Sequence, residues 1–518
     1  MIRSAPRADL PRDARWQPRG TARVSHRGRW RAAALVAVHL AVLGHIAHWR
    51  VSGTTLSPLE PSEAMWTLEL GYVNAGFLLF CGLLLTTLIL GRLFCGWACH
   101  VVAYQDLCAW LLARVGMRPR PVRSRLLVWV PLAIAVYMFA WPTLRRWWLG
   151  DPAPAWSLRL TTAAFWETFP GPGMALLTLL VDGALLVYWL GAKGFCTYGC
   201  PYGALFGLAD KVAVGRIRVS DACAGCGQCT AVCTSNVRVH EEVARFGMVV
   251  DPGCMKCLDC VSSCPKEALS FGFGRPSLFA AGRGRRPARG DFTWPEEMAL
   301  AVGFALGLLA LRSLYGVVPL LLAVGLGVLT AVGVVVGWRL LTGADLRVQS
   351  WSLKHDGRWT PAGRVAAFAL AAWFAFVAHS GWVQVQLHRG IADATAAMAP
   401  QRPAAEREAL LRQSLVAFDH VAAVGLATDP RVDQHAGLVL RELGAFDRAE
   451  ERLRRALAAR PDWPAAVVPL SDLLVMRRAV DEAEAMLRAL LQHHPDVVAA
   501  QQRLELLERG RERLQEPR

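Results

Sequence analysis

Twelve of the 14 cysteines in this chain fall into four groups whose spacing indicates metal or redox chemistry. Two groups are runs of four cysteines, CAGCGQCTAVC at 223–233 and CMKCLDCVSSCP at 254–265. The other two are pairs with three intervening residues, in GRLFCGWACH at 91–100 and GFCTYGCPYGALF at 194–206. A thioredoxin-like or zinc-binding pair has two intervening residues, so these pairs need another explanation. Cys81 and Cys108 stand alone and are expected to be packing residues.

Both four-cysteine runs have the spacing C-x2-C-x2-C-x3-C, which binds [4Fe–4S] clusters. In two-cluster ferredoxins the fourth cysteine of each run binds the other cluster. The predicted ligand sets are Cys223, Cys226, Cys229 and Cys264 for one cluster and Cys254, Cys257, Cys260 and Cys233 for the second. Zinc sites and disulfides are the alternatives, but zinc sites usually pair cysteines in twos and a reducing cytoplasm disfavours disulfides. Short β-prone segments at 216–220 and 268–271 suit an α+β ferredoxin domain.

The two C-x3-C pairs follow apolar runs and supply four more thiols: Cys95, Cys99, Cys196 and Cys200. On a continuous helix, residues i and i+4 have Cβ atoms about 5–6 Å apart, which suits metal binding better than a disulfide. Pro201 disfavours helix at Cys200, so the second pair could instead close into a disulfide. If the pairs converge, four thiolates could hold copper, zinc or another iron centre. We predict a shared redox or metal site; simple packing of helix ends is the alternative.

The composition is that of a membrane protein, with 54% hydrophobic residues and a mean hydropathy of +0.30. Seven apolar segments approach the roughly 20 residues that cross a bilayer. They lie at 31–49, 70–90, 126–142, 174–192, 297–314, 317–341 and 364–387. The chain is therefore expected to be a polytopic α-helical membrane protein of about seven spans with an inserted two-cluster ferredoxin domain.

The net charge of +16 is concentrated in segments that alternate with less basic loops. The arginine-rich segments are 1–31, 114–125, 275–289 and 339–364, and cytoplasmic loops carry such an excess. The charge is thus an orientation signal, and nucleic-acid binding is disfavoured. The prediction is an inner-membrane protein with a cytoplasmic N-terminus, a cytoplasmic ferredoxin domain and a periplasmic C-terminal domain. It requires a tight turn at Tyr315 and Gly316, because a single crossing of 297–341 would leave the C-terminal domain in the cytoplasm.

The expected domain organisation follows from these patterns. It consists of a basic leader 1–30, a four-span domain 31–200, a ferredoxin domain 201–274, a basic linker 275–296, a three-span segment 297–388 and a helical domain 400–518. In the last domain Ala483, Leu487 and Pro495 recur 34 residues after Ala449, Leu453 and Pro461. This period predicts a tetratricopeptide-like (TPR-like) α-solenoid that docks a protein partner, with an ordinary helical bundle as the alternative.

Ionisable residues inside the predicted spans are candidates for proton or quinone chemistry. Asp182 lies within the fourth span and His39 within the first, where charged groups are costly and usually functional. Along a helix, however, Asp182 is about 21 Å from Cys196, a long distance for one electron step. For His45 and His48, near the interface, a purely structural role is favoured.

At the motif Cys196–Pro201 the chain resembles the membrane polyferredoxins, a group that includes NapH-type, NosR-type, MauN-type and CcoG/FixG-type proteins. The resemblance rests on the C-x3-C pairs and the two ferredoxin runs and covers about residues 70–272, although His100 replaces the proline of the first pair. It implies a membrane-bound iron–sulfur protein that relays electrons between a quinol or cytoplasmic donor and a partner redox protein, as a quinol dehydrogenase component would.

Two other functions stay open at this point. A CcoG-like copper reductase or assembly factor for a respiratory oxidase would also use the C-x3-C pairs, although the immunoglobulin-like tail expected there is absent. A redox sensor that reports to a TPR-bound partner ranks last, because no signalling output domain is visible in the sequence.

Overall fold

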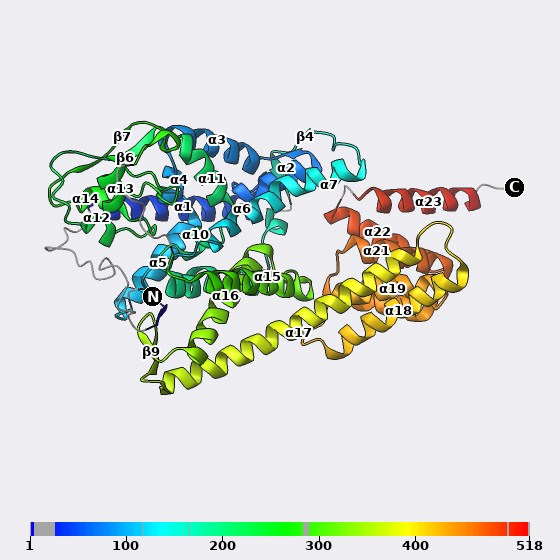
Figure 1. Ribbon diagram of the computed structural model, residues 1–518. Helices are drawn as coiled ribbons and strands as arrows, with labels where there is room; N and C mark the ends of the chain where they lie inside the picture. Colours follow the sequence, from blue (N-terminus) through cyan, green and yellow to red (C-terminus); the bar gives the residue numbers. More distant parts are fainter. Residues whose placement is uncertain are drawn as a thin grey trace. The chain divides into compact units, whose positions relative to one another are not determined.

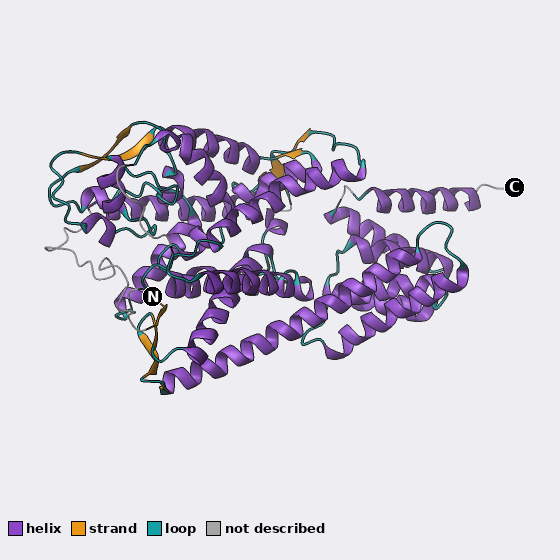
Figure 2. Ribbon diagram, viewed as in Figure 1, coloured by secondary structure: helices purple, strands orange, loops and turns teal. Residues whose placement is uncertain are grey.

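The computed structural model describes residues 2–4, 26–117, 119–163, 165–282, 290–494 and 497–515 (Figure 1). Most of the basic leader and residues 283–289 of the basic linker lie outside these ranges. The chain divides into two compact units, residues 1–308 with 319–373, and residues 309–318 with 374–518. Both units are predominantly helical, and the strands are few and short (Figure 2).

Six helices of the described residues are long and apolar enough to cross a membrane. Each is near or above the roughly 20 residues that a crossing needs, as predicted. They are Arg27–Ser52 in α1 (His26–Ser52), Leu127–Leu149, Pro172–Leu190, α15 (Trp294–Leu311), α16 (Leu320–Thr342) and α17 (Pro361–Ala397). The remaining predicted span, 70–90, is shorter: α3 (Ala75–Leu90) has 16 residues, about 24 Å at 1.5 Å per residue.

Two of these six helices contain π-helical turns. Leu127–Leu149 consists of η3 (Leu127–Trp129), α6 (Val130–Ala135), η4 (Val136–Ala140) and α7 (Trp141–Leu149). Pro172–Leu190 consists of α8 (Pro172–Thr178), η6 (Leu179–Leu185) and α9 (Leu186–Leu190). Each π-helical turn, η4 and η6, inserts an extra residue into the helical ladder, a feature that is frequent at functional sites.

The tight turn predicted at Tyr315 and Gly316 is present. It joins α15 to α16 through η8 (Leu314–Gly316), with φ angles of 52° at Ser313, 53° at Tyr315 and 72° at Gly316. Helices α15 and α16, on either side of the turn, approach closely, since a Cβ added at Gly307 would lie 2.7 Å from Thr330 Oγ1. Small residues of this kind let membrane helices pack backbone to backbone.

The ferredoxin domain is α+β, as predicted. Strands β6 (Gly215–Val219) and β7 (Leu269–Phe273) pair antiparallel, with Gly215 opposite Phe273 and Val219 opposite Leu269. Between them lie three short helices, α12 (Gln228–Ala231), α13 (Val239–Phe246) and α14 (Asp259–Ser262). The buried core residues are Ile217, Val237, Val239, Val243, Val249, Leu258 and Leu269.

One end of the membrane helices packs against this domain, as Figure 1 shows for α1, α3 and α4 (Leu93–Trp97). Arg31 at the start of α1 pairs with Asp259 of α14 at 3.5 Å. Gly215 of β6 lies against the end of α3, where an added Cβ would be 2.7 Å from Leu90 O. Helix α11 (Pro201–Val212) continues from the fourth predicted span into β6 and contacts α3 and α6.

Shorter elements connect these parts. They are β1 (Ile2–Ser4), β2 (Thr55–Leu56), η2 (Pro61–Glu63), α2 (Ala64–Leu70), β3 (Tyr72–Val73), β4 (Ser157–Leu158), β5 (Thr161–Thr162), η5 (Phe165–Thr168), η7 (Ser277–Phe279), β8 (Leu346–Val348), β9 (Trp351–His355) and β10 (Arg358–Trp359). The largest sheet has the order β1-β8-β9-β10.

The C-terminal helices repeat at the predicted interval. They are α18 (Ala404–Val424), α19 (Pro430–Glu442), α20 (Phe446–Ala459), α21 (Pro464–Met476), α22 (Val480–His493) and α23 (Val498–Gln515). Successive α19, α21 and α23 begin 34 residues apart, as do α20 and α22. The repeated small and apolar positions Ala449, Leu453, Ala483 and Leu487 are fully buried between helices. Pro495 lies outside the described residues.

Candidate metal centres

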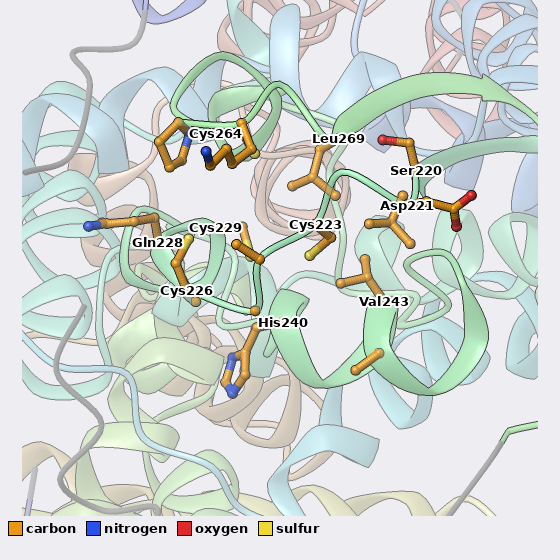
Figure 3. A pocket seen from close by; sticks show the side chains of 17 residues that line it. Ser220, Asp221, Cys223, Cys226, Gln228, Cys229, His240, Val243, Cys264 and Leu269 are labelled. Carbon is orange, nitrogen blue, oxygen red and sulfur yellow. The ribbon is translucent and has the colours of Figure 1, made fainter. Parts of the chain in front are cut away.

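Four of the predicted ligands line one cavity of about 290 Å³ in the ferredoxin domain. Cys223, Cys226 and Cys229 come from the first run, and Cys264 comes from the end of the second run. In Figure 3 their side chains lie around the same space, with His240 and Val243 at its edge. We call these four residues the first cluster site. The crossed ligand pattern predicts this grouping, because Cys264 faces the first run and not its own.

The second cluster site consists of Cys254, Cys257, Cys260 and Cys233. The first three are buried, with 7 to 9% of their surface exposed. Burial raises the pKa of the Cys233 thiol to about 12, and its electrostatic interaction with Cys254 adds to the shift. The pKa of Cys260 is raised in the same way, by burial and then by Cys254, Cys257 and Cys233. Cys254 and Cys260 belong to the buried core of the domain, and the half-buried Cys233 packs against it.

Backbone conformation explains how each run gathers three cysteines within a few residues. In the first loop Gly225 and Gly227 have φ angles of 62° and 70°, immediately before α12. In the second loop the equivalent residues Lys256 and Leu258 have φ angles of 50° and 65°, immediately before α14. The left-handed residues fold each chain segment tightly around its cysteines. This conformation suits glycine but strains a lysine or a leucine.

Both sites fit a [4Fe–4S] cluster in donor chemistry. Each offers four thiols from two chain segments within a largely apolar surrounding, and the first has a cavity ready to receive a bulky group. A bound cluster would supply one-electron redox chemistry. At the second site the protein residues contribute burial, which excludes water, and at the first site they contribute a backbone donor to sulfur, from Ala268 N to Cys264 Sγ at 3.3 Å.

A buried ion triad fastens the second cluster loop to the membrane domain. Asp210, at the end of α11, accepts from Lys256 Nζ at 2.9 Å and from Arg216 Nη1 at 2.8 Å. All three side chains are fully buried. Asp210 Oδ1 also accepts from the backbone N of Arg92 at 3.3 Å, so this one carboxylate joins α11, β6, the cluster loop and the segment after α3.

The C-x3-C pairs are built alike in the two halves of the membrane domain. Cys95 lies in α4 and Cys196 in α10 (Gly194–Tyr198), whereas Cys99 and Cys200 have extended backbone just before α5 (His100–Arg114) and α11. The continuous-helix geometry considered for these pairs is therefore wrong, because Ala98 and Gly199 end the first helix of each motif. All 14 cysteines, each within the described residues, are free thiols, so neither pair forms a disulfide.

The two pairs converge, as the shared-site hypothesis requires. Burial raises the pKa of Cys99 to about 12, with contributions from Cys95 and Cys196. Burial also raises the pKa of Cys200, with contributions from Cys196, Cys99 and Cys95. We call these four residues the membrane-face quartet. Cys95 and Cys196 lie in one buried core cluster with Cys99 packed against it, and Cys200 interacts with all three, so the quartet is a single cluster of thiols beyond the ends of α3 and α9.

Polar groups that sequence inspection missed surround the quartet. Gln105 Nε2 donates to Cys196 Sγ at 2.9 Å, and Gly203 N donates to Cys200 Sγ at 3.3 Å. Arg92 is 5% exposed, and its interactions with Cys95, Cys200 and Cys196 raise its pKa although burial alone would lower it. Lys193, 3% exposed, interacts with Cys196 and ion-pairs with Asp106. The sequence signal that could have identified Arg92 and Lys193 is their position just after an apolar run.

The segment around the first C-x3-C pair, residues 92–97, lies directly against the loop of the second cluster site. Trp97 Nε1 donates to Lys256 O at 3.1 Å, and Arg92 Nη1 donates to Pro252 O at 2.9 Å. A Cβ added at Gly96 would collide with Met255 O and lie 3.3 Å from Cys257 N. Residues of the first C-x3-C pair therefore pack on the backbone that carries two ligands of the second cluster site.

We expect Gly96→Ala to displace the second cluster loop, because the added methyl group meets a backbone carbonyl that no rotamer change can move. The measurement is iron content and visible absorbance of the purified protein, with about four irons lost in the variant relative to the wild type. Gly82→Ala is the matched control, since nothing lies within 4 Å of a Cβ at that position. Equal iron in both variants would show that the close approach is unimportant.

The two proton or quinone candidates have different surroundings. Asp182 lies in η6, is 6% exposed, and faces Gly325 of α16, where an added Cβ would collide with its Oδ1. Within the described residues this oxygen has no hydrogen-bond partner. His39 instead lies on an exposed side of α1 and bonds to Leu35 O at 2.8 Å. The structure thus distinguishes a buried carboxyl with one unpartnered oxygen from an exposed histidine bound to its own helix.

Comparison with known proteins agrees with this arrangement. A family described as a 4Fe-4S binding domain matches residues 74–118 and 172–220, which contain both C-x3-C pairs. A 4Fe-4S dicluster domain matches 222–269, and a tetratricopeptide repeat matches 440–506. No solved structure matches.

Among curated proteins, the chain is 26% identical to the ferredoxin-type protein NapH of Haemophilus influenzae, over 35% of this chain and 62% of that protein. It is 28% identical to the methylamine utilization ferredoxin-type protein MauN of Methylorubrum extorquens, over 42% of this chain and 74% of that protein. The match to NapH thus spans less than two thirds of that relative.

These matches define a class: the chain is a membrane protein with two [4Fe–4S] clusters in a ferredoxin domain and a TPR region. Within this class the predicted resemblance to the NapH and MauN ferredoxin-type proteins is confirmed.

Proposed function

We propose that this protein relays electrons between a quinol or a cytoplasmic donor and a partner redox protein, with the eight predicted cysteines as cluster ligands. The observation that carries the proposal is the direct packing of the second cluster loop on the membrane domain at Gly96 and Trp97. An electron that enters the ferredoxin domain thereby has a short path to the membrane face. NapH and MauN, described as ferredoxin-type proteins, support the same role.

The proposed orientation places the ferredoxin domain in the cytoplasm. In support, the start of α1 contacts this domain through Arg31 and Asp259, and the end of α3 contacts it through Leu90. Val122, just before the helix Leu127–Leu149, accepts from Asn236 Nδ2 at 3.1 Å. These contacts are those expected if all seven predicted segments, including the short α3, cross the membrane. With a cytoplasmic N-terminus, seven crossings make the C-terminal domain periplasmic.

The C-terminal domain is proposed to be a TPR-like solenoid that docks the redox partner. The matched region 440–506 and the 34-residue spacing of helix starts support this role, because stacked repeats of this kind present extended protein-binding surfaces. Docking would hold the partner on the side of the membrane where electrons leave or enter the relay.

Asp182 is the proposed proton acceptor during quinol oxidation. A quinol that loses two electrons also releases two protons, so a proton acceptor is needed near the site, and ionisable residues within the membrane serve in such proton relays. Asp182 is buried and its Oδ1 has no hydrogen-bond partner within the described residues, which leaves it available for this task. His39 is the weaker candidate because its ring already bonds to a helix carbonyl.

The test is anaerobic mixing of the intact, cluster-loaded protein with a reduced quinol analogue. We expect bleaching of the visible absorbance, and Asp182→Asn should slow it at least tenfold, with the iron content unchanged. Cu²⁺ reduction by the prereduced protein, with quinols inert towards it, would replace this proposal by the copper reductase function. Convergence of the quartet thiols is the observation that keeps that second function open.

A further inference from the structure

We propose that the membrane-face quartet binds a third [4Fe–4S] cluster, which is the redox centre next to the second cluster and closest to the lipid. The inference rests on the proposed relay function and specifies what the C-x3-C pairs contribute to it. Its ligands are Cys95, Cys99, Cys196 and Cys200, two from each structural half of the membrane domain.

A cluster and a single metal ion require different distances between the ligand sulfurs. Four thiolates that bind one ion at about 2.3 Å lie about 3.8 Å from one another. Within the described residues, only Asp345, His355 and Asp356 form a group of three ligand atoms within 4.8 Å of one another. No three quartet sulfurs meet this limit, although all four interact. The lack of such a tight group fits a cubane, in which each thiolate binds a different iron, better than it fits a single ion.

The two ferredoxin sites of the same chain can be compared with the quartet in the same way. Neither cluster site has three sulfurs within 4.8 Å either, yet these residues lie in the matched dicluster domain. The quartet therefore resembles the two ferredoxin sites of the same chain in having no tight group of three sulfurs.

Nearby positive charges and backbone hydrogen-bond donors also favour a bound cluster at the quartet. A [4Fe–4S] core with four thiolates is an anion, and the quartet has two buried cations beside it, Arg92 and Lys193. Arg92 Nε has no hydrogen-bond partner within the described residues, so a buried donor is left over near the sulfurs. Gly203 N donates to Cys200 Sγ at 3.3 Å, the same contact that Ala268 N makes with Cys264 in the first cluster site.

The position of the quartet sets the order of electron transfer. Cys223 of the first cluster site is exposed, the second cluster site is buried, and its loop lies on Gly96, between Cys95 and Cys99. Cys260 and Cys229 interact, which brings the two ferredoxin sites next to each other. One electron moves at each step, with one centre oxidised and its neighbour reduced, and no bond forms or breaks. The three sites thus form a path from the exposed face of the ferredoxin domain to the membrane.

The decisive experiment counts iron and acid-labile sulfide in full-length protein reconstituted anaerobically in detergent. We expect about 12 of each per chain in the wild type and about 8 in the double variant Cys95→Ser/Cys196→Ser. Electron paramagnetic resonance of the variant should retain the two ferredoxin signals and lose a third. Cys81→Ser, a change of the same type outside all sites, should keep all 12.

Three results would overturn the inference. They are about 8 irons in the wild type, unchanged iron in the double variant, or loss of one zinc or copper ion per chain on substitution. The ferredoxin signals report whether the variant has folded; if the double variant fails to fold, Cys99→Ser and Cys200→Ser singly replace it. A wild type with 12 irons that quinols cannot reduce would refute the proposed quinol relay but leave the third cluster in place.

Arg92→Gln provides a second, independent measurement. Loss of a buried cation beside an anionic centre favours its oxidised state, so one of three reduction midpoints should move to a more negative potential. Arg92→Lys should restore most of the shift. Three unchanged midpoints in Arg92→Gln would contradict the placement of a charged centre at the quartet.

Discussion

Asp210→Ala is expected to destabilise the ferredoxin domain by about 3–5 kcal/mol and to detach it from the membrane helices, because it leaves two buried cations without a counter-charge. Arg216 and Lys256 are fully buried and both pair with this carboxylate. The free energy of unfolding can be measured by urea titration, with cluster absorbance as the signal. Purified variant should lose the second cluster first, since Lys256 belongs to its loop.

Glu241→Gln is the matched control for this prediction. Glu241 pairs with Arg238 at 3.2 Å, and both side chains are partly exposed to solvent; exposed ion pairs contribute about 0–1 kcal/mol. Each of the two variants removes one negative charge that pairs with an arginine, and the two sites differ in burial. Similar urea midpoints for Asp210→Ala and the wild type would show that the buried triad does not fasten the domain.

Cys264→Ser and Cys233→Ser are expected to remove different clusters, each the cluster of the opposite run. Cys264 lines the cavity with Cys223, Cys226 and Cys229, so its loss should give the same residual spectrum as Cys223→Ser. Cys233 interacts with Cys254, so Cys233→Ser should match Cys254→Ser. Each variant should lose about four irons, measured chemically and by electron paramagnetic resonance. Matching of Cys264→Ser with Cys254→Ser instead would mean that the ligands are not crossed.

The sequence predicted the ferredoxin domain well because its ligands are contiguous and their spacing is specific. Only a few residues separate Cys223, Cys226 and Cys229, so a tight loop must bring them together whatever the rest of the chain does. The 34-residue period was equally local, and helices α19 to α23 repeat at that interval. Apolar length likewise predicted the membrane helices, apart from α3, which is shorter than expected.

The quartet and its surroundings could be predicted only in outline. Its cysteines come from segments about 100 residues apart, and nothing in a local pattern fixes whether two such segments meet. Gly96 and Asp210 illustrate the same limit. A glycine within a cysteine pair and an aspartate near a helix end are ordinary in sequence. They become specific only because Met255 O and Lys256 Nζ, from a distant part of the chain, lie against them.

The strained second loop has a consequence for biosynthesis. Lys256 and Leu258 hold left-handed backbone where the first loop has glycines, at a free-energy cost of about 1–2 kcal/mol per residue. The interactions that offset this cost are made with Asp210 and with residues after α3, which precede the loop in the chain and belong to the membrane domain. The first four hydrophobic segments are therefore inserted into the membrane before the second loop is complete. Delivery of a cluster to the second site then takes place on chains that have already entered the bilayer.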